Sequence, residues 1–263
     1  MSDPAEISQA GSPLRPKEES SPALAEIGSA VGALTILCSA RREHVIGSSA
    51  LFYPLIGLAL GVVSLAIDYV GRLAAGRLLA SVAVVLVAAV LTGGRPALGL
   101  SRMLIAGLTS RRRDTFLERL DGPVTPPMRA AFAFVLLAEM ICLSVLVSSR
   151  PAGLVFAPLL GRWSMVVLAT GARAARSDGR RLKFAPGVTF REFGWASTIT
   201  FAVMFGTAEL LGVVLGVAAA VISVAARVSL HRWLDGVTTT TLDAVCEIVQ
   251  LLTVLILVVL QRP

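Results

Sequence analysis

Two charged residues lie inside otherwise apolar runs of this sequence, and they are its first candidates for chemistry. Arg162 follows Gly161 within one apolar run, and Glu247 comes a few residues into the last run. Charged side chains at membrane depth are costly, so they are usually paired with one another or functional. Arg162 and Glu247 could therefore neutralise each other. Alternatively, the planar guanidinium of Arg162 could bind phosphate through two parallel hydrogen bonds.

Further unusual residues stand at the ends of apolar runs, and we expect them to share one face of the molecule. They are Gly93 and Gly94, Trp163, Thr238 in the segment Gly236-Val237-Thr238, and the loop arginines Arg173 and Arg176. The arginines of residues 173–183 would extend an anion-attracting field around Arg162. The alternative for these arginines is an ordinary solvated loop.

The composition places these residues in a membrane protein. The 263 residues have a mean hydropathy of +0.78 and are 55% hydrophobic but only 16% charged, whereas soluble domains are about a quarter charged. The net charge of +7 is explained by Lys and Arg that hold loops at the cytoplasmic surface. The basic residues flank apolar runs without interleaved aromatic residues, so we expect no nucleic-acid partner.

The chain divides into a tail and a membrane domain. Residues 1–22 are rich in Ser, Pro and Glu and are predicted to be a disordered tail. They lack the basic start and apolar core of a signal peptide, so we expect the N-terminus to be cytoplasmic. Residues 23–263 are predicted to form one integral membrane helical domain. The three cysteines are scattered and no metal-binding spacing of Cys or His occurs, so neither a disulfide framework nor a zinc site is expected.

The apolar runs predict an all-α, polytopic transmembrane bundle. The clearest spans are Leu51–Val70 and Arg77–Thr92, which form a hairpin, then Ala130–Val147, Gly153–Thr170 and Leu242–Leu260. The residues Ser148-Ser149-Arg150-Pro151-Ala152 read as the loop between the second pair. Ala97–Leu108 is too short to span, so it should lie on the interface or dip into it. Ala23–Ala40 is either interfacial or re-entrant.

The charge pattern predicts how the apolar run from Ala196 to Ala226 crosses the membrane. This run has 31 residues and is interrupted only by Glu209. Four basic segments occur, at Arg41-Arg42, 95–129, 173–191 and 227–232. If all four are cytoplasmic, an even number of crossings separates each pair. Residues 196–226 must then turn back near Glu209 in two short arms, which gives about seven spans and an outside C-terminus.

Soluble-enzyme motifs are absent, including the phosphate-binding loop, the dinucleotide fingerprint, HExxH and GxSxG. Five short segments instead resemble, in order, elements of the cobalamin synthase family (adenosylcobinamide-GDP ribazoletransferase) over roughly residues 30–260. The segments and the family elements they resemble are Leu34-Thr35 ("LTRLP"), Phe52-Tyr53-Pro54-Leu55-Ile56-Gly57 ("YFPLVG"), Leu91-Thr92-Gly93-Gly94 ("LTGGLHLDGLADTADG"), Pro158-Leu159-Leu160-Gly161-Arg162-Trp163 ("PxLGRW"), and Gly236-Val237-Thr238 with Leu242 and Glu247 ("GGVTGDVLGAAIELTE").

The resemblance implies a transferase of cobalamin biosynthesis in the bacterial inner membrane, with its active face in the cytoplasm. The family joins adenosylcobinamide-GDP, a nucleotide-activated corrinoid, to α-ribazole or its phosphate, releases GMP and uses Mg²⁺. Carried over to this chain, it makes Asp121 and Glu247 the catalytic and metal-binding acids. It makes Gly93, Gly94, Arg162, Trp163, Arg173, Arg176 and Thr238 the substrate-binding residues.

The sequence departs from the family where the metal ligands should be. The family's His and three Asp after "TGG" fall at Pro96, Leu98, Arg102 and Ile105. In the last motif the Asp becomes Thr240 and the final Glu becomes Gln250, while only the acid of "DSRIG" survives, as Asp121. Magnesium takes most of its charge compensation from carboxylates, and few remain here.

These departures leave more than one function open. The first is an active ribazoletransferase with an altered metal site. The second is an inactive relative that serves as a membrane scaffold or corrinoid-binding partner. A small transporter ranks last because intramembrane charge is sparse, and a CDP-alcohol phosphotransferase lacks its paired aspartate motif.

Overall fold

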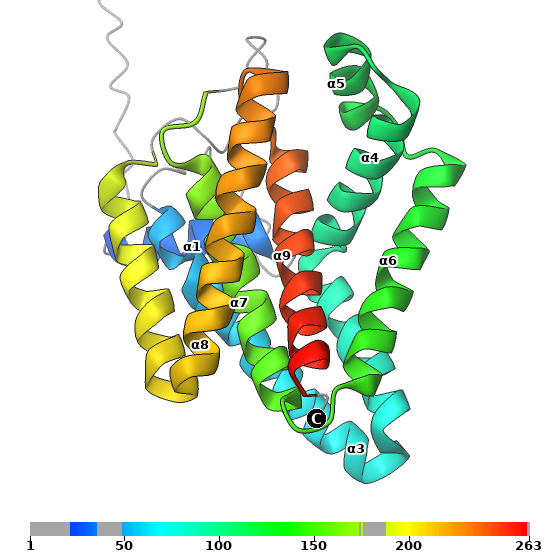
Figure 1. Cartoon of the computed structure of the whole chain (residues 1–263), viewed down its shortest axis with the longest axis vertical. Helices are drawn as coiled ribbons and strands as arrows, with labels where there is room; N and C mark the ends of the chain where they lie inside the picture. Colours follow the sequence, from blue (N-terminus) through cyan, green and yellow to red (C-terminus); the bar gives the residue numbers. More distant parts are fainter. Residues whose placement is uncertain (1–21, 36–48, 174, 176–187, 262–263) are drawn as a thin grey trace, which may run out of the picture.

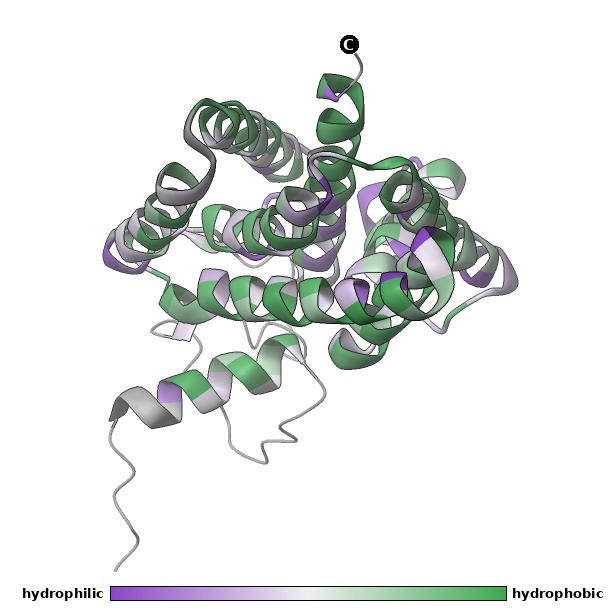
Figure 2. Cartoon of the chain, turned by 90° about the horizontal axis from the view of Figure 1, so that it is seen from below, coloured by the Kyte–Doolittle hydropathy of each residue, from purple (hydrophilic) through white to green (hydrophobic). Residues whose placement is uncertain are grey.

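The computed structural model describes residues 22–35, 49–173, 175 and 188–261, which form an all-α bundle (Figure 1). Most helices run roughly along one axis, whereas α1 (Pro22–Leu34) lies across that axis on the outside of the bundle (Figures 1 and 2). The 13 residues of α1 extend only about 20 Å, short of a bilayer's hydrocarbon core. The predicted tail up to residue 21 and residues 36–40 lie outside the described part of the chain.

α3 (Tyr53–Thr92) follows the short 3₁₀ helix η1 (Ala50–Phe52) and folds back on itself at Gly76. Gly76 has φ 81° and ψ 176°, a conformation that only glycine adopts without strain. The two arms then pack closely, since a Cβ added to Gly71 would lie 3.0 Å from the Cα of Ala80. The hairpin predicted over residues 51–92 is therefore confirmed.

α4 (Arg95–Thr109) stands upright beside α9 (Thr239–Leu260) in the upper part of Figure 1. The two helices touch at Gly99, where an added Cβ would lie 2.7 Å from the Cβ of Asp243. The helix expected at Ala97–Leu108 thus enters the bundle and does not lie flat on its surface. The short α5 (Arg113–Asp121) follows it.

α6 (Pro126–Val145) and α7 (Arg150–Ala169) form a second hairpin. Side chains along most of α7 are buried, because α3, α8 and α9 all pack against this helix. Two glycines of α3 allow the closest approach: a Cβ on Gly57 would meet the carbonyl oxygen of Pro158 at 2.4 Å, and one on Gly61 would meet Val155 Cα at 2.8 Å. The apolar runs predicted at 130–147 and 153–170 are confirmed as helices, and α7 is the central one.

α8 (Phe190–Leu234) also turns back, as the yellow and orange arms of Figure 1 show. A Cβ on Gly212 would lie 2.7 Å from the carbonyl oxygen of Met204, and one on Gly216 would lie 2.9 Å from the ring of Phe201. In a straight helix, residues eight positions apart are separated by about 12 Å. The structure therefore agrees with the expected turn near Glu209.

Within the described residues, five segments are long and apolar enough to cross a membrane. They are Ala50–Thr92, Pro126–Val145, Arg150–Ala169, Leu210–Leu234 and Thr239–Leu260. The first arm of α8 is not among them, so the structure does not confirm the expected count of about seven spans.

The outer surface of the bundle is apolar, and green segments surround it in Figure 2. Large side chains such as Leu73, Phe134 and Leu210 are more than two-thirds exposed. Contiguous apolar surface on this scale is not left in water. The chain is therefore a multi-pass membrane protein whose outer surface contacts lipid.

The basic segments meet at one end of the bundle. Arg113, just after α4, donates from Nη2 to the carbonyl oxygens of Leu234 at 2.8 Å and Ala175 at 3.1 Å. The amide of Val237 donates to the carbonyl of Arg173 at 3.0 Å. Segments 95–129, 173–191 and 227–232 thus share one end, as predicted, as far as the structure describes them. Arg41-Arg42 and residues 176–187 lie outside the described part.

At the opposite end, a buried charge pair joins the two hairpins. Arg150 is only 1% exposed, and its Nε and Nη2 donate to Oδ1 of Asp68 at 2.9 and 2.5 Å. Nη2 also donates to Oγ of Ser81 at 2.9 Å, and Nη1 donates to the carbonyl of Leu143. Arg72 Nε lies 2.9 Å from the other Asp68 oxygen. The sequence placed Arg150 in a loop, but it begins α7 because Asp68 provides a buried partner.

Arg150→Met should strongly destabilise the bundle, because it leaves the Asp68 carboxylate buried with one exposed partner. Loss of one partner of a buried pair costs about 3–5 kcal/mol. Unfolding in detergent, followed by melting temperature or denaturant midpoint, measures the change. Arg77→Met alters an exposed arginine of the same hairpin and should have little effect. Equal stability of the two variants would contradict this role for Arg150.

Gly99→Ala should separate α4 from α9 and lower the melting temperature. The new Cβ would lie only 2.7 Å from the Cβ of Asp243 and 3.0 Å from the carbonyl oxygen of Thr240, which is closer than van der Waals contact allows. Gly107→Ala on the same helix meets nothing within 4 Å, so it should be neutral or stabilising by up to about 1 kcal/mol. The reverse order of stability would show that the α4–α9 contact is not as tight as described.

Candidate functional site

The site begins where the chain breaks between α3 and α4. Gly93 and Gly94 have φ values of 65° and 61°, a left-handed conformation that glycine adopts without a Cβ penalty. Gly94 is buried beneath the ring of Phe132, 3.1 Å from where its Cβ would lie. Non-helical backbone in a membrane bundle is tolerated where it is buried in protein or lines a cavity. This break therefore marks a place where backbone groups can face a ligand.

Arg162 is held in the centre of the bundle by the contact between α7 and α9. The adjacent Gly161 allows that contact, since a Cβ there would lie 2.7 Å from Cγ of Gln250 and 3.0 Å from the carbonyl of Cys246. Arg162 is only 2% exposed as a result. Its guanidinium consequently depends on groups supplied by neighbouring helices.

Gln250 joins Arg162 to Glu247. Arg162 Nη1 donates to Oε1 of Gln250 at 2.7 Å, and Nε2 of Gln250 donates to Oε2 of Glu247 at 3.1 Å. The structure describes both charged residues, yet no ion pair closer than 4.0 Å joins them directly. Glu139 of α6 lies close enough for its carboxyl group to interact with both Glu247 and Arg162. In the described structure, Arg162 and Glu247 are therefore linked by hydrogen bonds through the amide of Gln250 and form no direct ion pair.

Two buried polar atoms of this cluster lack an ordinary hydrogen-bond partner. Nε of Arg162 finds no acceptor, and Oε1 of Glu247 receives no N–H or hydroxyl donor, so in the described part of the chain the only group left to pair with this carboxyl besides Gln250 is the carboxyl group of Glu139. Buried polar atoms left unsatisfied cost about 1–3 kcal/mol each. Such atoms in a native fold are candidates for ligand contacts.

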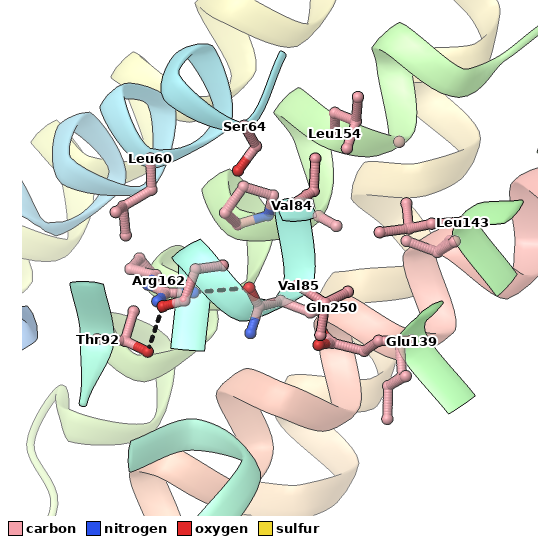
Figure 3. A pocket seen from close by; sticks show the side chains of 16 residues that line it. Leu60, Ser64, Val84, Val85, Thr92, Glu139, Leu143, Leu154, Arg162 and Gln250 are labelled. Atoms are coloured by element: carbon pink, nitrogen blue, oxygen red, sulfur yellow. Dashed lines mark hydrogen bonds between the residues drawn. The ribbon is translucent and has the colours of Figure 1, made fainter. Parts of the chain in front are cut away.

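Two cavities adjoin this cluster and share Ala88, Thr92, Glu139, Arg162 and Gln250 in their walls. The polar cavity is also lined by Gly94, Pro96 and Glu247, so it contains the start of α4. The apolar cavity extends from Arg162 between α3, α6, α7 and α9, as Figure 3 shows. Its other walls include Leu60, Val84, Val85, Leu143, Leu154 and Val254.

The structure brings some predicted site residues together and gives others a different role. Gly94, Arg162 and Glu247 line the polar cavity. Trp163 instead packs on α8, where its Nε1 donates to Oγ of Ser197 at 3.1 Å. Thr238 caps α9, because its hydroxyl accepts from the amide of Thr241 at 3.2 Å. These last two contacts position helices and leave Trp163 and Thr238 outside both cavity walls.

The remaining predicted residues lie at the basic end or outside the described part of the chain. Gly93 is exposed at the chain break, Arg173 is exposed and pairs its carbonyl with Val237, and Arg176 is not described. Asp121 ends α5, is half-buried and lines neither cavity. Their predicted contacts with substrate stay predictions.

The described residues do not fit a magnesium ion. Within that part of the chain, no group of three or more His, Cys, Asp or Glu side chains is arranged to hold a metal. The positions on α4 to which the resemblance assigns the family's His and three Asp hold Pro96, Leu98, Arg102 and Ile105, and Nη1 of Arg102 donates to the carbonyl of Leu120 at 3.2 Å. A cation beside these positions of α4 would face the positive charge of Arg102 and otherwise apolar side chains.

Sequence reasoning missed Glu139 and undervalued Gln250. Glu139 interrupts the apolar run of α6 in the same way that Arg162 interrupts α7, so the cost of intramembrane charge identifies it equally well. The sequence alone suggested only that Gln250 replaces the final Glu of the family's last motif. Its spacing of three residues from Glu247 places both on one face of α9.

The fold and the site define a multi-pass membrane protein with a polar cavity beneath an arginine-rich end. Residues 26–258 match the family described as cobalamin-5-phosphate synthase. The chain belongs to that family.

Curated relatives agree with this assignment. An adenosylcobinamide-GDP ribazoletransferase of Geotalea daltonii is 29% identical over 219 residues, which cover 82% of this chain and 88% of the relative. One from Shigella flexneri is 33% identical over 213 residues, with 78% and 85% covered. One from Roseiflexus sp. is 29% identical over 235 residues, with 86% of each chain covered. No solved structure matches the chain.

Gln250→Leu should destabilise the bundle by about 1–3 kcal/mol, because Arg162 loses a buried acceptor and Glu247 loses a buried donor. Denaturant unfolding in detergent measures the loss. Gln261→Leu is the matched control, since it removes only exposed hydrogen bonds to Val145 and Val147, which water replaces. Equal losses in the two variants would contradict the bridging role of Gln250.

Proposed function

We propose that this chain is an adenosylcobinamide-GDP ribazoletransferase. The observation that carries the proposal is the family match over residues 26–258, supported by curated relatives of that name over most of their length. The polar cavity supports the same conclusion, because it gathers a chain break, a buried arginine and two acids where a substrate could bind.

The reaction transfers a phosphoryl group. An acceptor hydroxyl of α-ribazole or its phosphate attacks the phosphorus on the corrinoid side of the diphosphate. A new P–O bond forms, the bond to the bridging oxygen breaks, and GMP leaves with the electron pair. Glu247 lines the polar cavity and holds a buried carboxyl oxygen there, so it is the best-placed base for the hydroxyl proton.

The arginine-rich end would receive the anionic donor. Arg173 and the arginines of residues 111–119 are exposed at this end, and Arg176, which lies outside the described residues, would add to their charge. Arginines attract diphosphates and stabilise charge on a transferring phosphoryl group. Gly93 and Gly94 would present backbone groups to the substrate. This end would face the cytoplasm of a bacterial inner membrane.

The proposed mechanism contains no step through magnesium. The described residues offer no carboxylate cluster for it, and Asp121 lies on a different helix from Glu247 and lines neither cavity. Binding and orientation are therefore assigned to arginines and to the cavity walls.

Expression of this chain in a ribazoletransferase-deficient bacterium supplied with cobinamide tests the proposal. We expect growth that requires cobalamin to be restored. Glu247→Gln should abolish it or reduce it at least about 100-fold, because it removes the proposed base. Arg77→Met, far from the cavity at the α3 bend, should complement as well as the unmodified chain.

Absence of growth despite normal amounts of folded protein in the membrane would contradict the transferase. It would favour the alternative of an inactive family member that acts as a membrane scaffold or corrinoid-binding partner. Full growth with Glu247→Gln would remove Glu247 as the base while leaving the transferase assignment in place.

A further inference from the structure

The apolar cavity lies between two helices that follow each other in the chain. α6 packs against α3, α4 and α9 but makes little contact with α7, and the cavity lies in the space that this leaves. Small residues of α3 and α7 keep the space open, namely Ser64, Ala88, Gly153 and Ala157. The cavity is therefore a slot along α7, with Ser64 and Leu154 near one end and Arg162 and Gln250 near the other (Figure 3).

The slot has the length and the walls that one hydrocarbon chain requires. From Gly153 to Arg162, α7 rises by about 14 Å, and half of a bilayer's hydrocarbon core is about 15 Å thick. The walls are mainly apolar side chains, including Leu60, Val84 and Val254, until the slot reaches Arg162. A polar ligand would find few hydrogen-bond partners along this length, and its burial there would be costly.

Hydrocarbon is the solvent around α6, the helix that closes one side of the slot. Phe134 and Ile141 of α6 are exposed on its outer face, whereas Leu143 is only 7% exposed and lines the slot. An unfilled apolar space forfeits van der Waals contacts, and such cavities stay dry and take up apolar molecules. In a membrane the apolar molecules within reach are the chains of the surrounding lipids.

A cation lies beyond the end of the slot that is farther from Arg162. Ser64 is one helical turn before Asp68 on α3, and Gly153 lies just after Arg150 on α7, so this end adjoins the buried pair of Asp68 and Arg150. Arg72 pairs with Asp68 through Nε at 2.9 Å, and its side chain remains 40% exposed. Guanidinium groups bind phosphate. The headgroup of a lipid whose chain fills the slot would therefore meet Arg72.

We infer that the slot binds an acyl chain of a phospholipid from the leaflet opposite the arginine-rich end, and that the lipid phosphate contacts Arg72. The chain ends below Arg162, where the apolar cavity adjoins the polar one. It fills the gap between α6 and α7 and separates the polar cavity from the bilayer. This site goes beyond the proposed transferase and does not depend on it.

Photocrosslinking in lipid nanodiscs tests whether a lipid chain enters the slot. The full chain is reconstituted with phosphatidylglycerol that carries a diazirine in the middle of one acyl chain, and the labelled residues are identified by mass spectrometry. We expect label at the buried slot residues Leu143 and Leu154, in addition to lipid-facing residues such as Phe134. Label confined to the lipid-facing residues would overturn the inference.

Matched substitutions on one arm of α3 locate the bound chain. Val84 is 4% exposed and lines the slot, whereas Leu86 is 55% exposed. Val84→Phe should fill the slot and lower the label at Leu154 at least about tenfold, because little space is left for the lipid chain. Leu86→Phe should leave this label unchanged. If Val84→Phe does not fold, Ala157→Leu fills the slot from α7. Undiminished label at Leu154 in a folded slot variant would place the lipid elsewhere and refute the site.

A second probe tests the phosphate contact. Diacylglycerol with the same diazirine chain lacks the phosphate, so it should label Leu154 less than phosphatidylglycerol does, by about fivefold or more. Arg72→Gln should abolish this difference, whereas Arg191→Gln, at the start of α8, should retain it. Equal labelling by the two probes would exclude a phospholipid.

A substrate is the competing occupant of the slot. Loss of the label at Leu154 when α-ribazole is added would make the slot a substrate site and would overturn the lipid assignment. Complementation does not enter any of these outcomes, so the transferase and the lipid site are tested separately.

Discussion

An arginine in the middle of an apolar bundle has to be surrounded by partners, and the centre of this protein is arranged around that requirement. Arg162 reaches Gln250 because Gly161 lets α7 and α9 approach closely. Gln250 then carries the connection to Glu247, and α6 contributes Glu139. Helices α6, α7 and α9 are thus joined by one polar cluster. Arg162, Glu139 and Gln250 line both cavities, and Glu247 lines the polar one.

Arginines elsewhere join segments through carbonyl groups and carboxylates. Arg113 caps the end of α8 and binds the segment at Ala175, and Arg227 donates to the carbonyl of Val167 near the end of α7 at 2.9 Å. Cationic groups are favourable at helix C-termini. These contacts hold the basic segments together above the polar cavity. Arg150 acts similarly at the other end, where it pairs with Asp68.

Much of the fold follows from the sequence, because long apolar runs and short connections determine hairpins. The bends at Gly76 and near Glu209 were predicted from run length and charge. Contacts between distant helices were not predictable in this way. Arg150 read as a loop residue since nothing local reveals Asp68 as its partner. Trp163 and Thr238 were assigned to substrate from a motif, yet one packs on α8 and the other caps α9.

The sequence also predicted part of the site. The cost of intramembrane charge singled out Arg162 and Glu247, and the structure lines the polar cavity with both. The same cost identifies Glu139, whereas the role of Gln250 required knowledge of which face of α9 meets α7. Gly57 and Gly99, which belong to or adjoin family-like segments, prove to be close helix contacts. Part of the resemblance thus records close packing between helices.

The central claim is that the arginine-rich segments lie together on one side of the membrane, above the polar cavity. Single cysteines at the exposed positions Arg112, Arg173 and Ser148 test it, in a chain whose native cysteines are replaced by alanine. A membrane-impermeant maleimide should label positions 112 and 173 only in inside-out vesicles, and position 148 only in cells whose outer surface is accessible. Labelling of positions 112 and 173 from opposite sides would contradict the account.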